Sequence, residues 1–444
     1  MFTTCIKSAL VAAWVLALVG CGGGGSGGEP TPPAPTVPVA LALVVEVGGV
    51  AATPDGTGTY VVRPGRAVAV KANRVATWTG DNLGSAVTRT DTGSDALLWA
   101  SRFGNPGAVV AGAYEVTARA TDGSTQAIKF SVQPVDQGNG DYMVFAANGS
   151  RQTLSIDFDA ATYTMTDTAG GTDSGTLSDP IAPMLSWTFR SGRITGINTA
   201  TFRRLGDNIV GGFPMAVPFG AAGTYATYPF IASRGLLTTQ ASLDGAYDRA
   251  GISYAAGGKQ STISQIGVTG GGTVLQQCVD IGIFEIANCP PASLVLSDIE
   301  ADPVIAGTWL LKEPGTGTVQ GRFAMAQVEG ENIYLSAGVS PADGSQVLRV
   351  GVPAGMADLT FGSSHGWSTV GTLDVVNATP SDYNISLGAT GLSLTRGLAM
   401  TPVGIRTATR PGQSYFTMRS QRLELLIAAR NSPAAGFLHI GVVD

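Results

Sequence analysis

The chain has 444 residues, of which 61 are glycine and only 13% are charged, and its formal net charge at pH 7 is −6. The acidic balance argues against nucleic acid or an anionic membrane surface as an electrostatic partner. Low charge with abundant Gly, Thr, Val and Ala favours short strands joined by tight turns, so the composition predicts an all-β protein. The length allows about two to four domains.

The first segment, residues 1–20, has the features of a secretory signal peptide. Lys7 supplies a short basic start, and an apolar run from Ala9 to Val19 follows, which is shorter than the ~20 residues that a membrane span needs. Leu18-Val19-Gly20-Cys21 then resembles the bacterial lipobox. The resemblance implies cleavage before Cys21 and attachment of a diacylglyceryl group to its thiol. The alternative is an ordinary signal peptide that happens to precede a cysteine.

Residues 21–38 are predicted to be a tether between this lipid anchor and the first folded domain. The sequence after Cys21, GGGGSGGEPTPPAPTVP, combines a flexible glycine half with a stiffer, polyproline-like half. Gly22 follows Cys21 where an inner-membrane retention signal would have Asp, and by resemblance to the enteric sorting rule this favours the outer membrane. We therefore expect a lipid-anchored protein of the cell envelope.

Residues 39–134 are predicted to form one β-sandwich. Residues 112–120 alternate small or apolar with polar side chains, Asp122-Gly123 is a hairpin turn signal, and apolar residues alternate again on the return strand. This stretch resembles the last two strands of bacterial immunoglobulin-like or PKD-like modules, in which a G-x-Y-x-V pattern places a corner tyrosine. The resemblance implies that Tyr114 is this tyrosine and that Trp78 is the core tryptophan.

Beyond a short connector, the chain is predicted to contain two repeated β-units, residues 141–240 and 241–344. Gly140-Asp141-Tyr142 opens the first unit and Gly245-Ala246-Tyr247 opens the second, a pattern that resembles the strand starts of small calycin-type barrels. Val210-Gly211-Gly212-Phe213 matches Gln320-Gly321-Arg322-Phe323, about 110 residues later. Each unit has room for about eight short strands, which fits an up-and-down barrel or a sandwich.

In the matching segments, glycine in mid-strand indicates a bulge or a close backbone approach. The phenylalanine two positions later is expected on the same face, where it fills the space that the glycine leaves. Gly211 and Gly321, and likewise Phe213 and Phe323, are therefore expected on equivalent strands of two similar units.

Residues 345–444 form a further β-rich region for which no repeat is predicted. Leu423 to Ala429 is apolar except for Glu424, so it is either a buried strand or a short helix, and periodicity does not decide between them. The apolar segment FLHIGVV at 437–443 is expected to be a strand within a sheet.

Two cysteines are left for a structural role once Cys5 is removed and Cys21 is acylated. Cys278 and Cys289 are expected to form a disulfide that closes a short loop, because an exported protein folds in an oxidising compartment. They have neither a CxxC spacing nor a nearby histidine, so no metal site is predicted.

One motif suggests catalysis. Gly362-Ser363-Ser364-His365-Gly366 matches the G-x-S-x-G nucleophile elbow of α/β-hydrolases, which would make Ser364 a nucleophile, His439 its base and Asp374 or Asp382 the orienting acid. An elbow lies between a strand and a helix, but the residues after the motif indicate another strand. The favoured interpretation is therefore a hairpin turn.

The remaining titratable residues give no catalytic or metal site. The two histidines, His365 and His439, are expected to lie at the surface or to be satisfied by hydrogen bonds. The sequence contains three acidic clusters: Asp91/Asp95, Asp157/Asp159 and Asp298/Glu300/Asp302. None of them has the spacing of an EF-hand calcium loop. Asp157 and Asp159 are expected to point to solvent together. A calcium ion there or at 136–141 is the alternative.

These observations predict a non-enzymatic, lipid-anchored envelope protein without a cofactor. It would display β-domains for binding, adhesion or structural support, with the membrane as one partner and a protein or glycan as another. A small-ligand carrier is the main alternative, and its mark would be a roomy apolar cavity with a few inward polar groups. A serine hydrolase that uses Ser364 is the other.

Overall fold

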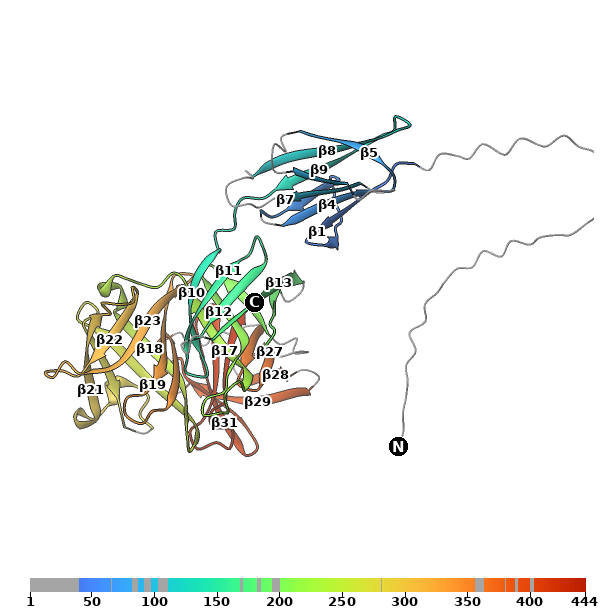
Figure 1. Cartoon of the computed structure of the whole chain (residues 1–444). Helices are drawn as coiled ribbons and strands as arrows, with labels where there is room; N and C mark the ends of the chain where they lie inside the picture. The colour runs from blue at the N-terminus through green and yellow to red at the C-terminus, as the bar shows by residue number, and fades with distance from the viewer. Residues whose placement is uncertain are drawn as a thin grey trace, which may run out of the picture.

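The computed structural model describes residues 40–64, 66–81, 87–91, 97–102, 111–167, 171–181, 185–193, 200–280, 282–355, 363–379, 381–387, 390–399 and 403–444. The signal, Cys21 and the tether lie outside these residues. The described chain is all-β, as its composition predicts, with two open sheets followed by three closed barrels (Figure 1). Within the described residues, no helix has the length and apolar character needed to cross a membrane.

The two open sheets form the predicted N-terminal β-sandwich. One sheet has the order β2 (Val50–Ala51), β1 (Leu43–Val47), β4 (Ala67–Ala72), β7 (Leu97–Arg102) and β6 (Val87–Asp91). The other has the order β3 (Thr59–Val62), β9 (Thr125–Val132), β8 (Gly112–Ala120) and β5 (Ala76–Asp81). Val45 and Val70 of the first sheet share a core with Trp78, Val116 and Phe130 of the second, because inward apolar residues alternate with outward polar ones along each strand.

Each barrel is an eight-stranded antiparallel meander whose first and last strands pair. Barrel 1 contains β10 (Gly140–Ala146), β11 (Arg151–Asp157), β12 (Thr162–Thr166), β13 (Thr172–Ile181), β14 (Ser186–Arg190), β15 (Thr201–Leu205), β16 (Asn208–Ala216) and β17 (Tyr225–Ser233). Barrel 2 contains β18 (Gly245–Ala255), β19 (Gly258–Thr269), β20 (Val274–Cys278), β21 (Leu294–Ala301), β22 (Thr308–Lys312), β23 (Val319–Val328), β24 (Glu331–Val339) and β25 (Gln346–Pro353).

The C-terminal β-rich region closes a third barrel with the same strand order, although no repeat is visible in its sequence. Barrel 3 contains β26 (Ser364–Ser368), β27 (Gly371–Ala378), β28 (Asp382–Leu387), β29 (Thr390–Ala399), β30 (Arg406–Arg410), β31 (Gln413–Arg419), β32 (Leu423–Ala428) and β33 (Leu438–Val443). The architecture is therefore repeated three times. Barrel 2 also extends past residue 344, because β25 is the strand that closes it.

The two glycine–phenylalanine segments were expected on equivalent strands, but they lie on strands that differ by one position in the order of their barrels. Phe213 lies in β16, the seventh strand of barrel 1, whereas Phe323 lies in β23, the sixth strand of barrel 2. Gly211 and Gly321 also differ in their surroundings. A Cβ on Gly211 would lie 2.6 Å from the Phe202 Cβ, whereas Gly321 lies at a register shift between β22 and β23, with its nearest neighbour at 3.7 Å.

The predicted openings of the two units, in contrast, do coincide. Tyr142 lies in β10 and Tyr247 lies in β18, the first strands of their barrels. Each hydroxyl donates to a carbonyl four residues earlier, at 2.6 Å to Gly138 and 2.9 Å to Leu243. The same bond therefore fixes the entry of the chain into both barrels.

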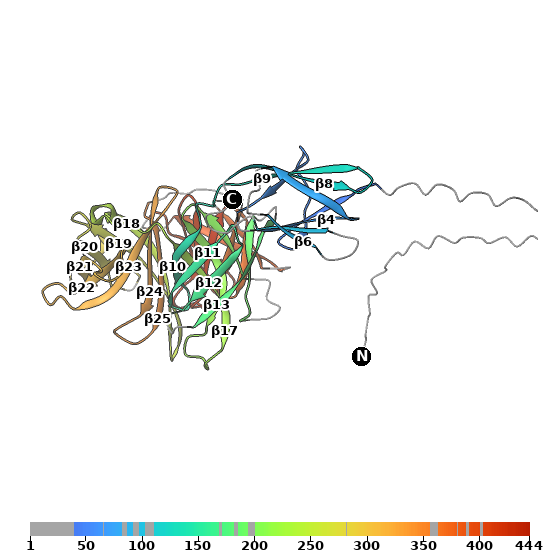
Figure 2. The same ribbon diagram turned by 45° about the horizontal axis from the view of Figure 1, so that its top comes forward.

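The three barrels pack against one another through strands that are buried on both faces (Figure 2). β26, β32 and β33 are buried at every position, which explains the mostly apolar sequences of β32 and β33. Leu423–Ala428 is a strand, paired with β31 and β33. Trp367 of β26 illustrates the contact with barrel 1. Its indole Nε1 donates to the Thr201 Oγ1 at 2.9 Å, and its ring lies where a side chain on Gly212 would be.

Two arginines that follow β3 contact barrel 1. The Arg66 Nε donates to the Asp159 carbonyl at 2.9 Å, and its Nη2 lies 3.3 Å from the Asp179 Oδ1. Arg63 lies over the Trp187 ring, 5.1 Å from its centroid. Polar contacts of this kind differ from the continuous apolar core that joins the barrels.

Candidate functional site

The interiors of the three barrels are filled differently. Aromatic rings occupy the interior of barrel 1, where Tyr163, Phe189 and Phe213 meet edge to face with centroid distances of 4.9, 5.0 and 5.8 Å. Eight strands enclose a space that such side chains can fill, or that can hold one small ligand. Side chains fill barrel 1, whereas barrel 3 contains a cavity.

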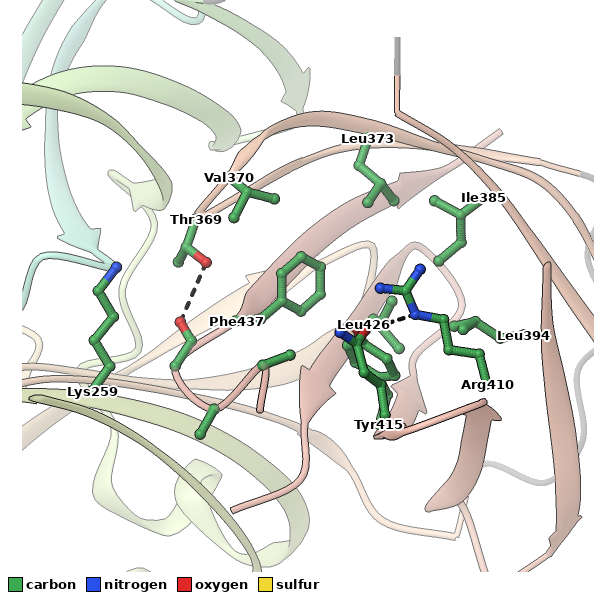
Figure 3. Close-up of a pocket in the computed structure, with 14 residues that line it drawn as sticks. Lys259, Thr369, Val370, Leu373, Ile385, Leu394, Arg410, Tyr415, Leu426 and Phe437 are labelled. Atoms are coloured by element: carbon green, nitrogen blue, oxygen red, sulfur yellow. Dashed lines mark hydrogen bonds between the residues drawn. The ribbon is translucent and has the colours of Figure 1, made fainter. Parts of the chain in front are cut away.

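Barrel 3 contains a cavity of about 360 Å³ at one end (Figure 3). Its walls are apolar side chains from several strands and from the turn before β33, namely Leu373, Ile385, Leu394, Tyr415, Leu426 and Phe437. The Tyr415 and Phe437 rings meet edge to face at 5.7 Å. The alternation along each strand directs these residues inward, and glycine and alanine at 434–436 leave the space open beside them.

Polar groups lie at the rim of this cavity. The Gln413 Oε1 accepts hydrogen bonds from the Arg410 Nε at 2.7 Å and from the Tyr415 hydroxyl at 2.5 Å. Lys259 reaches the rim from barrel 2, and Figure 3 shows its ammonium group at the side of the cavity where Thr369 lies. An apolar hollow with a few oriented polar groups is the usual form of a small-molecule site.

Deeper in the same barrel lies a layer of buried polar side chains. Ser364 and Glu424 are each 1% exposed, and the Ser364 hydroxyl donates to the Glu424 Oε2 at 2.7 Å. Burial raises the pKa of Glu424 to about 7, against the opposing effect of hydrogen bonds from Tyr383 and Ser364. Burial likewise raises the pKa of Tyr383. The carboxyl group of Glu424 therefore keeps its proton to a higher pH than an exposed glutamate does.

His439 lies in this layer and contradicts the expectation of a surface or satisfied histidine. Its side chain is fully buried, and neither ring nitrogen has a hydrogen-bond partner among the described residues. Burial, with a smaller effect from the charge of His365, lowers the pKa of His439 to about 3, so the ring is neutral at pH 7. His365 does fulfil the expectation, because its Nδ1 is hydrogen-bonded to Asp374.

Two glycines on neighbouring strands make the space for His439. A Cβ on Gly366 would lie 2.4 Å from the imidazole Cε1, and a Cβ on Gly441 would lie 2.8 Å from its Nε2. Gly366 and Gly441 are paired directly across β26 and β33. The last glycine of the G-x-S-x-G motif is therefore needed for packing against a histidine.

The structure does not form the nucleophile elbow that this motif suggests, nor the hairpin turn that we expected. Gly362 lies outside the described residues, and Ser364 begins strand β26, paired with Val375 on one side and Val443 on the other. The Ser364 hydroxyl donates to Glu424, and Asp374 contacts His365 instead of His439. The strand forms because both of its neighbours supply hydrogen-bonding partners, which local sequence does not reveal.

Ser364 and His439 nevertheless come close together. The Ser364 Oγ lies 3.1 Å, and the His439 Nε2 2.8 Å, from the point where Gly441 would carry a Cβ. They are not hydrogen-bonded to each other. Asp382, the other candidate acid, is exposed and accepts from the Ser381 hydroxyl at 2.7 Å. The Ser–His–Asp relay is thus not assembled among the described residues.

The acidic clusters serve turns and ion pairs. Asp159 is buried, against expectation, and its Oδ2 accepts from the Asp136 and Asn139 nitrogens at 2.8 Å. Asp302 contacts Arg322, with 3.0 Å between the Oδ2 and the Nε. Within the described residues, no three His, Cys, Asp or Glu side chains are grouped as metal ligands would be. The side chains of Asp91 and Asp95 lie outside the described part.

The expected disulfide is present. Cys278 at the end of β20 is bonded to Cys289, with their Cα atoms 5.7 Å apart. Both cysteines precede β21, so the bridge closes a loop at one end of barrel 2.

Comparison with protein-family models, with curated proteins and with solved structures gave no match to this chain.

Proposed function

We propose that this chain is a non-enzymatic binding protein of the cell envelope whose third barrel takes up one small, mainly apolar molecule. The observation that carries the proposal is the cavity of about 360 Å³ bounded by Leu373, Leu394 and Phe437. Cavities of roughly 300–1,000 Å³ accept small organic ligands. Arg410 and Gln413 at the rim would orient a polar end of such a molecule.

Binding can be tested with naphthalene as a neutral fluorescent probe. Val370 lies at the cavity wall and is 63% exposed, so Val370→Trp should close the entrance without disturbing the core. We expect naphthalene to bind the native protein, and to bind this variant at least about tenfold more weakly. Val339→Trp is the matched control, because Val339 is 61% exposed and does not line the cavity. Equal binding to both variants, or none to the native protein, would refute the proposal.

The envelope location rests on the lipobox at 18–21 and the tether that follows it. Cys21→Ser should abolish the incorporation of labelled palmitate in cells and release the protein from membranes. Equal labelling of the native protein and the variant would show that Cys21 is not the lipidated residue. This experiment is independent of the cavity, so either half of the proposal can fail without the other.

A further inference from the structure

A second cavity, of about 380 Å³, lies where barrel 2 opens beside barrel 3. Six polar side chains line it from strands of barrel 2, and they are Arg249, Ser261, Thr262, Ser264, Gln277 and Arg349. Two aromatic rings form an apolar part of its wall. Phe284, within the disulfide loop, meets Phe416 of β31 edge to face, with their centroids 5.4 Å apart.

Arg249 is an unusual residue for such a position. It is only 6% exposed, and its Nε and Nη2 donate to the Ser264 Oγ at 3.3 and 3.0 Å. Among the described residues, no carboxylate lies within ion-pair distance of Arg249 or Arg349. Burial lowers the pKa of Arg249 to about 10. Interaction with Tyr334, whose ring centroid lies 5.8 Å from the guanidinium carbon, opposes this shift, and the charge of Arg349 adds to it. Arg249 is thus a buried cation at neutral pH without an anionic partner, which is a costly arrangement unless a ligand supplies one.

The strand register places Arg249 and Arg349 on the same face of the sheet. Arg249 in β18 pairs with Gly351 in β25, and Gly251 pairs with Arg349, so both arginines lie on the same face of neighbouring strands. The glycines leave room for them. A Cβ on Gly251 would lie 3.0 Å from the Arg349 Cγ. Arg430 adds a third cation to the wall, and Asp280 is the carboxylate there, at an exposed position.

We propose that this end of barrel 2 binds a small organic acid with an aromatic or other apolar body. The carboxylate would accept hydrogen bonds from Arg249 and Arg349, because a guanidinium group matches a carboxylate in a bidentate geometry. Gln277 offers a further amide donor. The body of the ligand would lie against Phe284 and Phe416. This site is separate from the cavity of barrel 3, and its two arginines would select a charged ligand.

The proposal is tested by calorimetric titration of the full mature chain with benzoate, with its neutral amide benzamide, and with inorganic sulfate. We expect benzoate to bind and benzamide to bind at least about tenfold more weakly, because a charge-assisted hydrogen bond is lost. Arg349→Gln should weaken benzoate binding by at least about tenfold. Arg349 is only partly buried, so this variant should fold. Arg249→Lys, which keeps the charge but loses the planar fork, should also weaken it.

Arg190→Gln is the matched control, since it removes an exposed guanidinium that lines neither cavity and should leave benzoate binding unchanged. Equal binding of benzoate and benzamide would overturn the proposed selection for charge. Unchanged binding in Arg349→Gln and Arg249→Lys would show that the ligand lies elsewhere. Sulfate binding as tightly as benzoate would refute the role of the two phenylalanines. Naphthalene binding to the Arg349→Gln variant should be normal, so failure of this site is distinguishable from failure of the barrel 3 cavity.

Discussion

Replacing Glu424 by Gln should change how the stability of barrel 3 depends on pH. In the folded chain the pKa of this carboxyl is raised to about 7 from a reference value of 4.5, because it is buried. Between these two values the folded state holds a proton that the unfolded state has released. Stability from this group is therefore greatest below pH 4.5, falls as pH rises towards 7, and is constant above that.

The size of the effect follows from the gap between the two pKa values. Each pKa unit is worth about 1.4 kcal/mol, so the native carboxyl loses about 3 kcal/mol of stability across this window. Glutamine is uncharged at every pH and can still accept the hydrogen bond from the Ser364 hydroxyl. The free energy of unfolding of Glu424→Gln, relative to the native protein, should thus increase by about 3 kcal/mol between pH 4.5 and 7.

Urea denaturation at a series of pH values, followed by tryptophan fluorescence, measures this difference. The variant is compared with the native protein at each pH because both contain His439, whose effect on the pH dependence of stability is opposite to that of Glu424. The pKa of His439 is lowered from 6.5 to about 3, so its contribution to stability is lost as pH falls through that range. Glu300→Gln is the control, because the side chain of Glu300 is 59% exposed. A difference between Glu424→Gln and the native protein that does not vary with pH would refute the reasoning.

Three further predictions concern packing and covalent structure. Gly366→Ala should lower the free energy of unfolding by at least about 2 kcal/mol in a urea titration, because the new methyl group would lie 2.4 Å from the His439 ring and from the Ile440 carbonyl. Gly192→Ala is the control and should be close to neutral, because the space around Gly192 is open. Phe213→Ala should cost about 3–5 kcal/mol, since its ring is fully buried among the aromatic side chains of barrel 1, and an unchanged denaturation midpoint would contradict this. In exported protein, Cys278 and Cys289 should resist alkylation until a reductant is added, as intact mass would show, and the double Cys→Ser variant should lose about 2–3 kcal/mol of stability.

The fold class could be predicted from the sequence because strand formation depends on local composition and alternation. The tyrosine openings at Tyr142 and Tyr247 were informative for the same reason, since each makes a bond within its own strand entry. The prediction that Phe213 and Phe323 lie on equivalent strands was wrong, because a glycine near an aromatic residue occurs in a curved sheet for more than one structural reason. One such glycine avoids the Phe202 side chain, and another lies at a register shift.

The candidate sites were much harder to predict. Arg249 and Arg349 are about a hundred residues apart in the sequence, and only the closure of barrel 2 brings their strands together. His439 offered no local signal of its burial, because the space for its ring comes from Gly366 on a strand far away in the chain. The apolar cavity has no sequence motif, because its wall consists of ordinary inward-facing strand positions whose side chains leave part of the barrel interior unfilled.

The apolar core shared by the barrels limits how this chain can be divided. Val210, Val350 and Ile440 belong to three different barrels, yet they are members of one cluster. A fragment cut at either connection between barrels would carry a strip of such residues into water, at about 25 cal/mol for each Å² exposed. The barrels are therefore repeats by topology, but by energetics they form a single cooperative unit. Insertions, fusions and exchanges of segments should be tolerated at the sandwich end of the chain, where the contacts are polar, and not between the barrels.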